Sequence, residues 1–400
     1  MVIEAPDILN SIFSEALPKQ SKVCEWLLDC IADQLDPEQY GNIRKSSTSL
    51  ALLRILHDWH VATDKSPGAV RAVFLDFSKA FDRIDHCILL NKLQTMGVPG
   101  TLLAWIRAFL TDRQHRVKLN GAVTSWVNVN GGVPQGTKLG PLLFLVMVND
   151  LTSNLPMIKY VDDTTVYQTT TDIVNCDMQS AMNDIISWCD TNHMKLNEKK
   201  TVSMDVIFTN NRPSVHHVKI NNSPIETVHS FKLLGLLITD DLSWEANTAH
   251  ICQKANSRLY GLTLLRRAGL SQQQLLRVFK SIIRPVVEYA CTVWHFSLTK
   301  ADSDKIESIQ KRALTTIFGK HPYESNLESA GLPSLEKRRG ELCQKLFSAM
   351  QQPGHKLHHL LPQVRSSAHH LRRMRNRESI RCHTKRSSNS FIMYCLTNLQ

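Results

Sequence analysis

The sequence lacks the features that define several common protein classes. Its ten cysteines stand singly without the paired spacing of zinc knuckles, so zinc is not expected. Such scattered thiols are typical of a reduced intracellular protein, cytoplasmic or nuclear. No run of about 18 apolar residues and no signal-peptide pattern is present, so we expect no membrane association. The GxxxxGK[ST] loop is also missing, so a nucleotide would not be held by a P-loop.

The composition is that of a folded chain with a basic segment near its end. Its 400 residues are 42% hydrophobic and 21% charged, enough for two or three domains with apolar cores. The formal net charge is +11, and residues 356–386 hold nine Lys or Arg and a single acidic residue, Glu378. Such a segment either binds polyanions or is a solvated, disordered tail, and both interpretations stay open.

The first part of the chain alternates between helical and strand patterns. Apolar residues at helical spacing predict helices at 49–64, 101–112, 139–151 and 172–192. A further helix is expected between an N-cap at Ser78 and a stop at Gly97. Strand-like runs stand at 71–77, 202–208 and 231–239, and hairpins are predicted around Gly121 and over 158–168.

The pattern becomes almost wholly helical after residue 242. Helices are predicted at 245–267, 271–294 and 300–318. We therefore expect an α+β domain over 1–242, a helical domain over 243–345, and a basic, loosely ordered tail over 346–400.

Three aspartates carry the candidate chemistry. Asp76 interrupts the apolar run VFLDF, and Asp162 and Asp163 stand at the turn of the 158–168 hairpin. Taken singly, Asp76 is better explained by a salt bridge or a cap, and the pair by ordinary turn chemistry. Together, three carboxylates at strand ends could hold two divalent cations for in-line phosphoryl transfer. Hard oxygen ligands favour Mg²⁺, with Mn²⁺ as a substitute.

Five sequence blocks occur in an order that resembles the reverse transcriptases of non-LTR (LINE-type) retrotransposons. They are FLDFSKAFDRIDH (74–86), GGVPQGTKLGPLLFLVMVNDL (131–151), KYVDDT (159–164), LNEKKT (196–201) and FKLLGLLITDDLSW (231–244). The later helical part resembles the same family, and the similarity covers roughly residues 20–345. The resemblance implies an RNA-directed DNA polymerase whose fold is a right-hand palm, an antiparallel sheet with packed helices, with partial fingers and an all-helical thumb. Its partners would be an RNA template, a DNA primer and dNTPs; the oligomeric state is not indicated.

The resemblance also assigns catalytic and metal-binding roles. Asp76, the Phe77 carbonyl, Asp162 and Asp163 would surround the metal ions. Lys200 would lie near the pyrophosphate as a general acid, although a solvated loop lysine is an equally good interpretation.

Further residues would contact the nucleotide. Phe81 would stand under the sugar and exclude a 2′-hydroxyl, although without the family it reads as a core aromatic. Gln135 and Gly136 would contact the incoming nucleotide and the template base, and Tyr160 and Val161 would line the site near the primer end. The turn in LLGLL (233–237) would hold the primer.

The sequence departs from the family pattern in three places. Val161 replaces the usual Ala, and QYGNIRKSSTS (39–49) matches a family block only loosely. Residues 1–17 show none of the family's basic finger strands, so we expect an N-terminally truncated copy. An alternative is a catalytically dead remnant that folds and binds nucleic acid. A third interpretation, an RNA-templated RNA polymerase, is opposed by Phe81.

Overall fold

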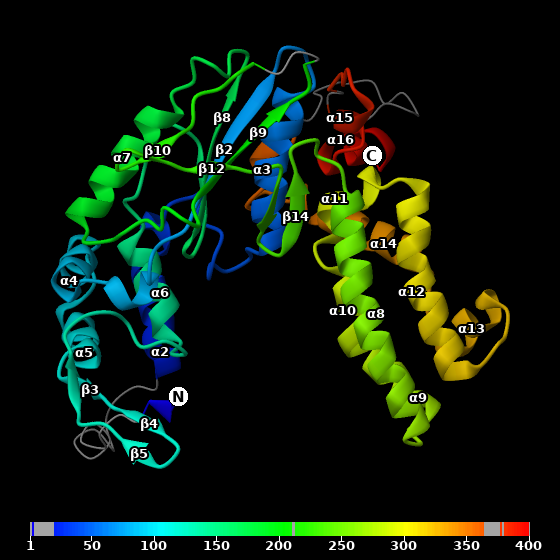
Figure 1. Ribbon diagram of the computed structural model, residues 1–400, viewed down its shortest axis with the longest axis horizontal. Helices are drawn as coiled ribbons and strands as arrows, with labels where there is room; N and C mark the ends of the chain where they lie inside the picture. The colour runs from blue at the N-terminus through cyan, green and yellow to red at the C-terminus, as the bar shows by residue number, and fades with distance from the viewer. Residues whose placement is uncertain (1, 4–19, 210–212, 364–376, 378–379, 400) are drawn as a thin grey trace.

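The computed structural model describes residues 2–3, 20–209, 213–363, 377 and 380–399. The fold is mixed α+β, with a central sheet from which two arms extend in the same direction (Figure 1). The sequence expectations for residues 1–17 and for much of the basic segment 356–386 lie outside the described residues.

The central sheet has five strands within the described residues. Their spatial order is β12 (Glu226–Thr227), β9 (Val202–Ile207), β2 (Ala69–Leu75), β8 (Asp163–Thr170) and β7 (Met157–Tyr160). β12 pairs with β9 in parallel, and every other pair is antiparallel. All seven residues of β2 are buried, because the strand lies between two neighbours and both faces of the sheet are covered. This double cover explains why six of the seven residues of β2 are apolar; the exception, Arg71, forms an ion pair with Asp205.

Helices cover the two faces of the sheet. Residues Val70, Ala72 and Phe74 of β2 pack on the face that carries α3 (Thr48–Ala62). Val73 and Leu75 of β2 belong to the second core, which is covered by α6 (Leu139–Met147) and α7 (Met178–Thr191). The side chains of a strand point alternately to opposite faces, so one strand joins both cores.

The first arm contains short helices and a protruding pair of hairpins. Its helical elements are α2 (Gln20–Ile31), η1 (Ala32–Gln34), η2 (Ala80–Arg83), α4 (His86–Thr95) and α5 (Gly100–Leu110). Its strands are β3 (Arg113–His115), β4 (Val117–Leu119), β5 (Ala122–Val123) and β6 (Val127–Val129), and β1 (Val2–Ile3) pairs with β4.

The helix expected from Ser78 is wrong at its start. Lys79 is left-handed and a 3-10 turn follows, so α4 begins only at His86. The cap is Asp85, whose carboxylate accepts hydrogen bonds from the backbone of Cys87 and Ile88. The stop at Gly97 is confirmed by its φ of 72°.

The second arm begins after two separate hairpins. One pairs β10 (Lys219–Ile220) with β11 (Ser223–Pro224). The other pairs β13 (Ser230–Leu233) with β14 (Leu236–Thr239), so the single strand expected at 231–239 is two strands. The arm itself contains α8 (Glu245–Arg267), α9 (Gln272–Val278), η3 (Phe279–Ile283), α10 (Arg284–Glu288), α11 (Cys291–Trp294), η4 (His295–Ser297), α12 (Lys300–Phe318), α13 (Tyr323–Ala330) and α14 (Leu335–Met350).

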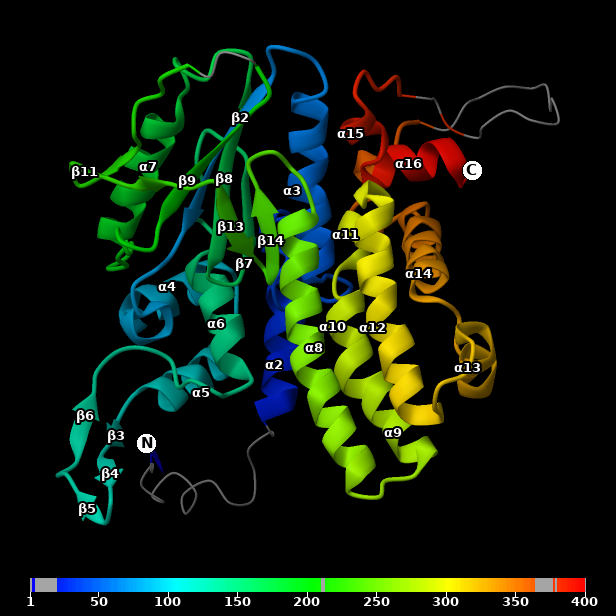
Figure 2. The ribbon, with the colours of Figure 1, turned by 45° about the vertical axis from the view of Figure 1, so that its right-hand side comes forward.

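The single helix expected over 271–294 is interrupted. A π segment precedes Pro285, which cannot donate a backbone hydrogen bond, and Ala290 has a φ of 48°. Figure 2 shows α8, α10 and α12 lying side by side in this arm. No helix in the described part of the chain is both long and apolar enough to cross a membrane.

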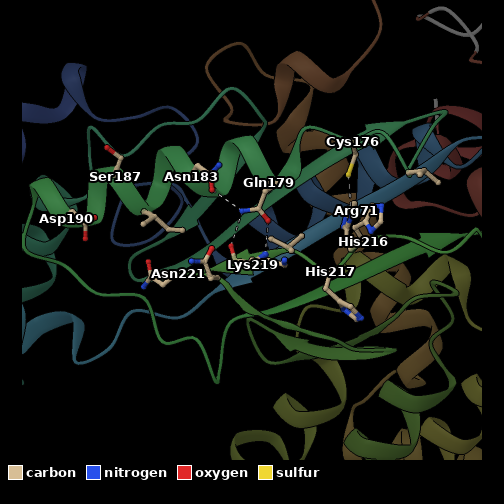
Figure 3. A pocket seen from close by; sticks show the side chains of 14 residues that line it. Arg71, Cys176, Gln179, Asn183, Ser187, Asp190, His216, His217, Lys219 and Asn221 are labelled. Carbon is tan, nitrogen blue, oxygen red and sulfur yellow. Dashed lines mark hydrogen bonds between the residues drawn. The ribbon is translucent and has the colours of Figure 1, made fainter.

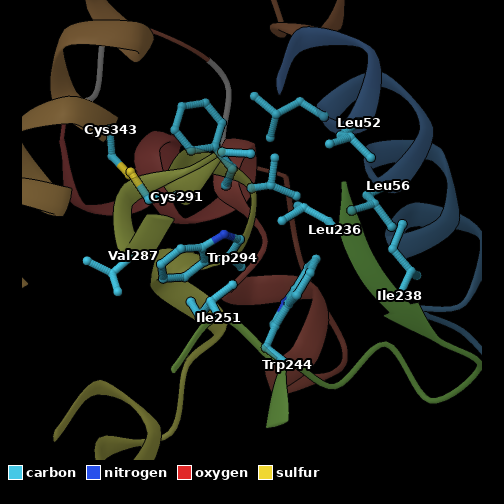
Figure 4. Close-up of a cluster of buried hydrophobic side chains, with 14 of the residues drawn as sticks. Leu52, Leu56, Leu236, Ile238, Trp244, Ile251, Val287, Cys291, Trp294 and Cys343 are labelled. Carbon is cyan, nitrogen blue, oxygen red and sulfur yellow. The ribbon is translucent and has the colours of Figure 1, made fainter. Parts of the chain in front are cut away.

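The described end of the chain is ordered, in contrast to the loose tail expected for 346–400. After η5 (His358–Leu360), the short helices α15 (Lys385–Ser388) and α16 (Phe391–Asn398) pack against α3. Phe391, Ile392 and Cys395 are buried in the same core as the residues of α3, β14 and α11 drawn in Figure 4. The apolar residues of α16 span only eight positions, which is too short for a helical period to be recognised in the sequence. The division into three domains stays a prediction.

Candidate functional site at the end of the central sheet

Asp76 stands where β2 leaves the sheet. The last pair of the ladder is Leu75 with Thr164, so the next residues on the two antiparallel strands are Asp76 and Asp163. The backbone of Asp76 is held from its other side by the loop after α7. Its N–H donates to Thr201 Oγ1 at 3.2 Å, and its carbonyl accepts from the Asn197 N–H at 2.7 Å. Together with the ladder to β8 that ends at Leu75, these two contacts with the loop 197–201 fix the strand end that presents the carboxylate.

Asp162 lies in the tight turn that joins β7 to β8. Tyr160 pairs with Asp163, which leaves Val161 and Asp162 as a two-residue loop. Val161 has a φ of 60°, the left-handed region in which β-branched residues are genuine outliers. Hairpins of this length usually place glycine, asparagine or aspartate in such a position. The chain therefore holds a strained turn next to the carboxylates.

The three carboxylates raise the local negative charge. Partial removal from water, followed by the charge of Asp76, raises the pKa of Asp162. Desolvation, followed by the charges of Asp162 and Asp76, raises the pKa of Asp163 to about 6. Within the described residues no Lys, Arg or His forms an ion pair with any of the three. A bound divalent cation would neutralise the negative charge that these three carboxylates share.

The fit to a metal depends on a mixed set of ligands. Among the described residues, no three His, Cys, Asp or Glu side chains are arranged so that they could hold a metal ion by themselves. The predicted set differs, because it combines carboxylates with the main-chain carbonyl of Phe77. Mg²⁺ accepts such oxygen ligands and keeps positions for water and phosphate. The negative charge of the three aspartates and the oxygen donors of the predicted set are compatible with Mg²⁺.

The predicted nucleotide-binding residues fall in a second group. The loop 131–136 docks on the turn after Asp76, with the Val133 N–H donating to the Phe81 carbonyl at 2.8 Å. Gln135 Nε2 donates to Asp82 Oδ1 at 3.3 Å, which brings Gln135 close to the turn that carries Phe81. The Phe81 ring is half-buried and packs against the ring of Phe144 at 5.0 Å. Phe81 therefore packs partly as a core aromatic residue, as its sequence context alone predicts.

The other predicted residues lie around the hairpin and the loop 196–201. Gly136 is exposed, with a φ of 83° and open space around its Cα. Lys200 is exposed, and its N–H donates to the carbonyl of Asn197, the residue that contacts Asp76. Tyr160 is half-buried; burial, then Tyr289 and Asp163, raises the pKa of its phenol. Among the described residues no hydrogen bond or ion pair joins Phe81, Gln135 or Gly136 to the three carboxylates.

Sequence reasoning missed the residues that hold the site. Thr201 is fully buried, and its hydroxyl oxygen accepts a hydrogen bond from the Asp76 N–H. Gln39 is 2% exposed, and its Oε1 accepts the Val161 N–H at 3.0 Å. Both are polar residues inside an apolar environment, but nothing local in the sequence tells which distant backbone group they contact.

A large cavity elsewhere does not coincide with these residues. A space of about 750 Å³ lies between α7 and the segment that leads into β10, lined by Gln179, Asn183, His216 and Lys219, with Arg71 beside it (Figure 3). None of the predicted site residues lines it. The Arg71 guanidinium is already occupied by Asp205 and the His216 carbonyl.

Comparison with known proteins gives a consistent result. The family model described as reverse transcriptase (RNA-dependent DNA polymerase) matches residues 13–238. The RNA-directed DNA polymerase from mobile element jockey of Drosophila melanogaster is 27% identical over an alignment of 324 residues, which covers 76% of this chain and 35% of that protein. The probable RNA-directed DNA polymerase from transposon X-element, of the same species, is 27% identical over 322 residues, with the same coverage. The chain spans about a third of the length of these relatives.

A solved structure is similar at lower identity. Telomerase from Candida tropicalis, in complex with a fragment of telomeric RNA, matches with a TM-score of 0.45 and 12% identity, over 98% of this chain and 54% of that one.

Proposed function

The chain belongs to the reverse transcriptase family, in the group from non-LTR (LINE-type) retrotransposons, and we propose that it adds deoxynucleotides to a primer on an RNA template. The observation that carries the proposal is the placement of Asp76, Asp162 and Asp163 at adjoining strand ends, close enough for the charges of Asp162 and Asp76 to contribute to the raised pKa of Asp163. Nucleotidyl transfer concentrates negative charge, and carboxylates that bind divalent cations are the common protein solution for it.

Asp76, Asp162, Asp163 and the Phe77 carbonyl would hold Mg²⁺, or Mn²⁺ in its place. The ions would supply activation of the primer 3′-hydroxyl and neutralisation of the leaving pyrophosphate. The protein's own part is positioning. Because the N–H and the carbonyl of Asp76 are both hydrogen-bonded to the loop 197–201 and Asp162 lies in a two-residue turn, the carboxylates are positioned before substrate arrives.

Phe81, Gln135 and Gly136 would receive the nucleotide. The docked loops 80–86 and 131–136 form one unit, which gives Phe81 a rigid support on Phe144. A ring held in a fixed position excludes a 2′-hydroxyl better than a mobile ring does. A fixed Phe81 ring would therefore favour deoxynucleotides over ribonucleotides. Tyr160 and Val161 would line the primer side, and Lys200 would approach the pyrophosphate as a general acid.

The two arms would hold the nucleic acid. β2 ends and β8 begins at the side of the sheet from which the arms extend (Figure 1). We propose that the central sheet with its helices is the palm, the first arm belongs to the fingers, and α8 to α14 form the thumb. Lys254, Arg266 and Arg267 are exposed on α8 and would contact phosphates of the template–primer duplex.

The test is primer extension by the purified 400-residue chain on a primed RNA template with Mg²⁺ or Mn²⁺. We expect dNTP incorporation that disappears in the Asp162→Asn/Asp163→Asn double variant and persists in Asp184→Asn, an exposed aspartate of α7. Incorporation no greater than that of the double variant would refute catalysis. Retained binding of the primed template would then support the nucleic-acid-binding remnant.

The role of Phe81 has its own test. Replacement by valine removes the ring, and we expect ribonucleotide incorporation to rise roughly tenfold relative to deoxynucleotides. The matched control is Phe109→Val, because Phe109 stacks on Trp105 in α5 and is not among the residues proposed to bind the nucleotide. Equal discrimination in Phe81→Val and the wild type would exclude this role.

A further inference from the structure

The segment around Gln39 runs beside the strand that leads into the catalytic hairpin. The Tyr40 N–H donates to the Lys159 carbonyl at 2.7 Å, and the Lys159 N–H donates to the Glu38 carbonyl at 3.0 Å. Gln39 and Lys159 therefore form a parallel bridge outside the regular strands. The Lys159 ammonium, fully buried, is held by Asp36 at 2.6 Å and by the carbonyl of Leu151 at 2.7 Å. The segment is thus anchored to β7 by both backbone and side chain.

The Gln39 side chain closes the gap between this segment and the turn. Its Oε1 accepts two backbone hydrogen bonds, from Gly41 at 2.8 Å and from Val161 at 3.0 Å. The Val161 N–H lies in the loop of the hairpin, beyond the last ladder pair. A donor there needs an acceptor from outside the sheet, since an unpaired buried N–H is costly.

The segment around Gln39 approaches the Val161–Asp162 turn closely because residue 41 is glycine, and Lys356 contacts the same segment. A Cβ atom on Gly41 would lie 2.5 Å from both the nitrogen and Cγ2 of Val161, so no other residue allows this contact without movement. On the other side, Lys356 donates to the Gln39 carbonyl and its ammonium lies 4.4 Å from the centre of the Tyr40 ring. The backbone of Gln39 is therefore held by contacts that do not involve its hydrogen bond to Val161.

We propose that Gln39 is a positioning residue for the polymerase site: it keeps Val161 in its left-handed conformation and so fixes the direction of the Asp162 carboxylate. Valine resists a positive φ because its branched Cβ crowds the backbone. Such a conformation persists only where the surroundings impose it. The catalytic consequence rests on the proposed function, whereas the control of the turn does not.

The first experiment separates the hydrogen bonds from the shape of the side chain. Gln39→Leu keeps the approximate volume and removes the acceptor, whereas Gln39→Glu keeps an acceptor oxygen. We expect kcat for dNTP incorporation to fall about 100-fold in Gln39→Leu, with affinity for primed template little changed, and Gln39→Glu to recover part of the loss. The matched control is Gln34→Leu, an exposed glutamine whose amide bonds the Met96 carbonyl. Wild-type kcat in Gln39→Leu would overturn the proposal.

The second experiment asks whether Gln39 acts through Val161. Glycine reaches positive φ without strain, so the turn in Val161→Gly no longer needs an external restraint. In that background Gln39→Leu should cost much less kcat than it does in the wild type. An equal loss in both backgrounds would show that Gln39 acts elsewhere and would overturn the proposal.

A third readout does not require catalysis. Hydrogen exchange of the peptide that covers residues 157–165 should be faster in Gln39→Leu than in the wild type, and close to wild type in Gln34→Leu. If the wild type incorporates no dNTP, the proposed function fails, while faster exchange still supports the hold on the turn. Unchanged exchange would overturn the role of Gln39 even in an active enzyme.

Discussion

Replacement of Asp163 by asparagine should stabilise the metal-free protein at neutral pH. The charges of Asp162 and Asp76 and the desolvation of the hairpin oppose ionisation of Asp163, whose pKa is raised from 3.8 to about 6. The folded protein therefore binds a proton more tightly than the unfolded chain does. The free energy of unfolding consequently decreases as pH rises from about 4 to about 6, and the full penalty is present above that window.

The size of the effect follows from the same pKa difference. Taken at face value, the difference between 3.8 and about 6 corresponds to about 3 kcal/mol. The Asp163 side chain is exposed, so solvent screening reduces the expected gain to about 1 kcal/mol. For a chain of 400 residues, that gain raises Tm by about 1 °C.

The assay is thermal or urea unfolding in chelator-treated buffer near pH 7.5 and pH 4, with Asp184→Asn as the matched control. Asp163→Asn should be the more stable protein near pH 7.5, and the difference should vanish near pH 4. Added Mn²⁺ should stabilise the wild type more than the variant, because a ligand that binds only the folded state adds to stability by mass action. A variant that is equal to or less stable than the wild type near pH 7.5 without metal would refute the reasoning.

Three further substitutions test the supports of the fold. Thr201→Val leaves the Asp76 N–H without its acceptor and should lower the free energy of unfolding in urea by about 1–2 kcal/mol. Thr201→Ser keeps the hydroxyl and should leave the free energy of unfolding close to that of the wild type. Equal losses in the two variants would contradict the role of the hydroxyl. Lys159→Met leaves Asp36 without its cation and should cost about 3 kcal/mol, and a neutral result would mean that the buried pair is dispensable. Phe391→Ala should cost about 3–4 kcal/mol; a loss below about 1 kcal/mol would show that α16 does not belong to the cooperative core.

The sequence allowed the strand ends of the candidate site to be predicted, because their signals are local. The run that ends at Leu75 and the turn at Asp162 each combine apolar strand residues with an abrupt polar stop. The ladder then brings Asp76 beside Asp163, as antiparallel neighbours require. The catalytic and metal-binding roles of these residues were predicted from the family resemblance, because the spacing of the residues alone did not indicate them.

Contacts between distant segments were beyond the reach of sequence patterns. The left-handed Val161 is invisible to propensity, since valine is a poor choice for that conformation. Its restraint comes from Gln39, 122 residues earlier in the chain. The break at Tyr289 was missed for a related reason: the apolar period continues through it, while the hydroxyl of Tyr289 bonds the carbonyl of Leu234, 55 residues away. Tertiary contacts decided these conformations, against the local signal.

The docking of α16 on α3 affects how the protein is made. Asp64, just after α3, accepts hydrogen bonds from His383, 319 residues later, and α16 follows to cover apolar residues of α3. At ribosomal rates of about 5–20 residues per second, α3 waits about 15–60 s for this partner. Collapse of apolar segments takes microseconds. During synthesis, that face of α3 therefore stays without its native cover until α16 has been made.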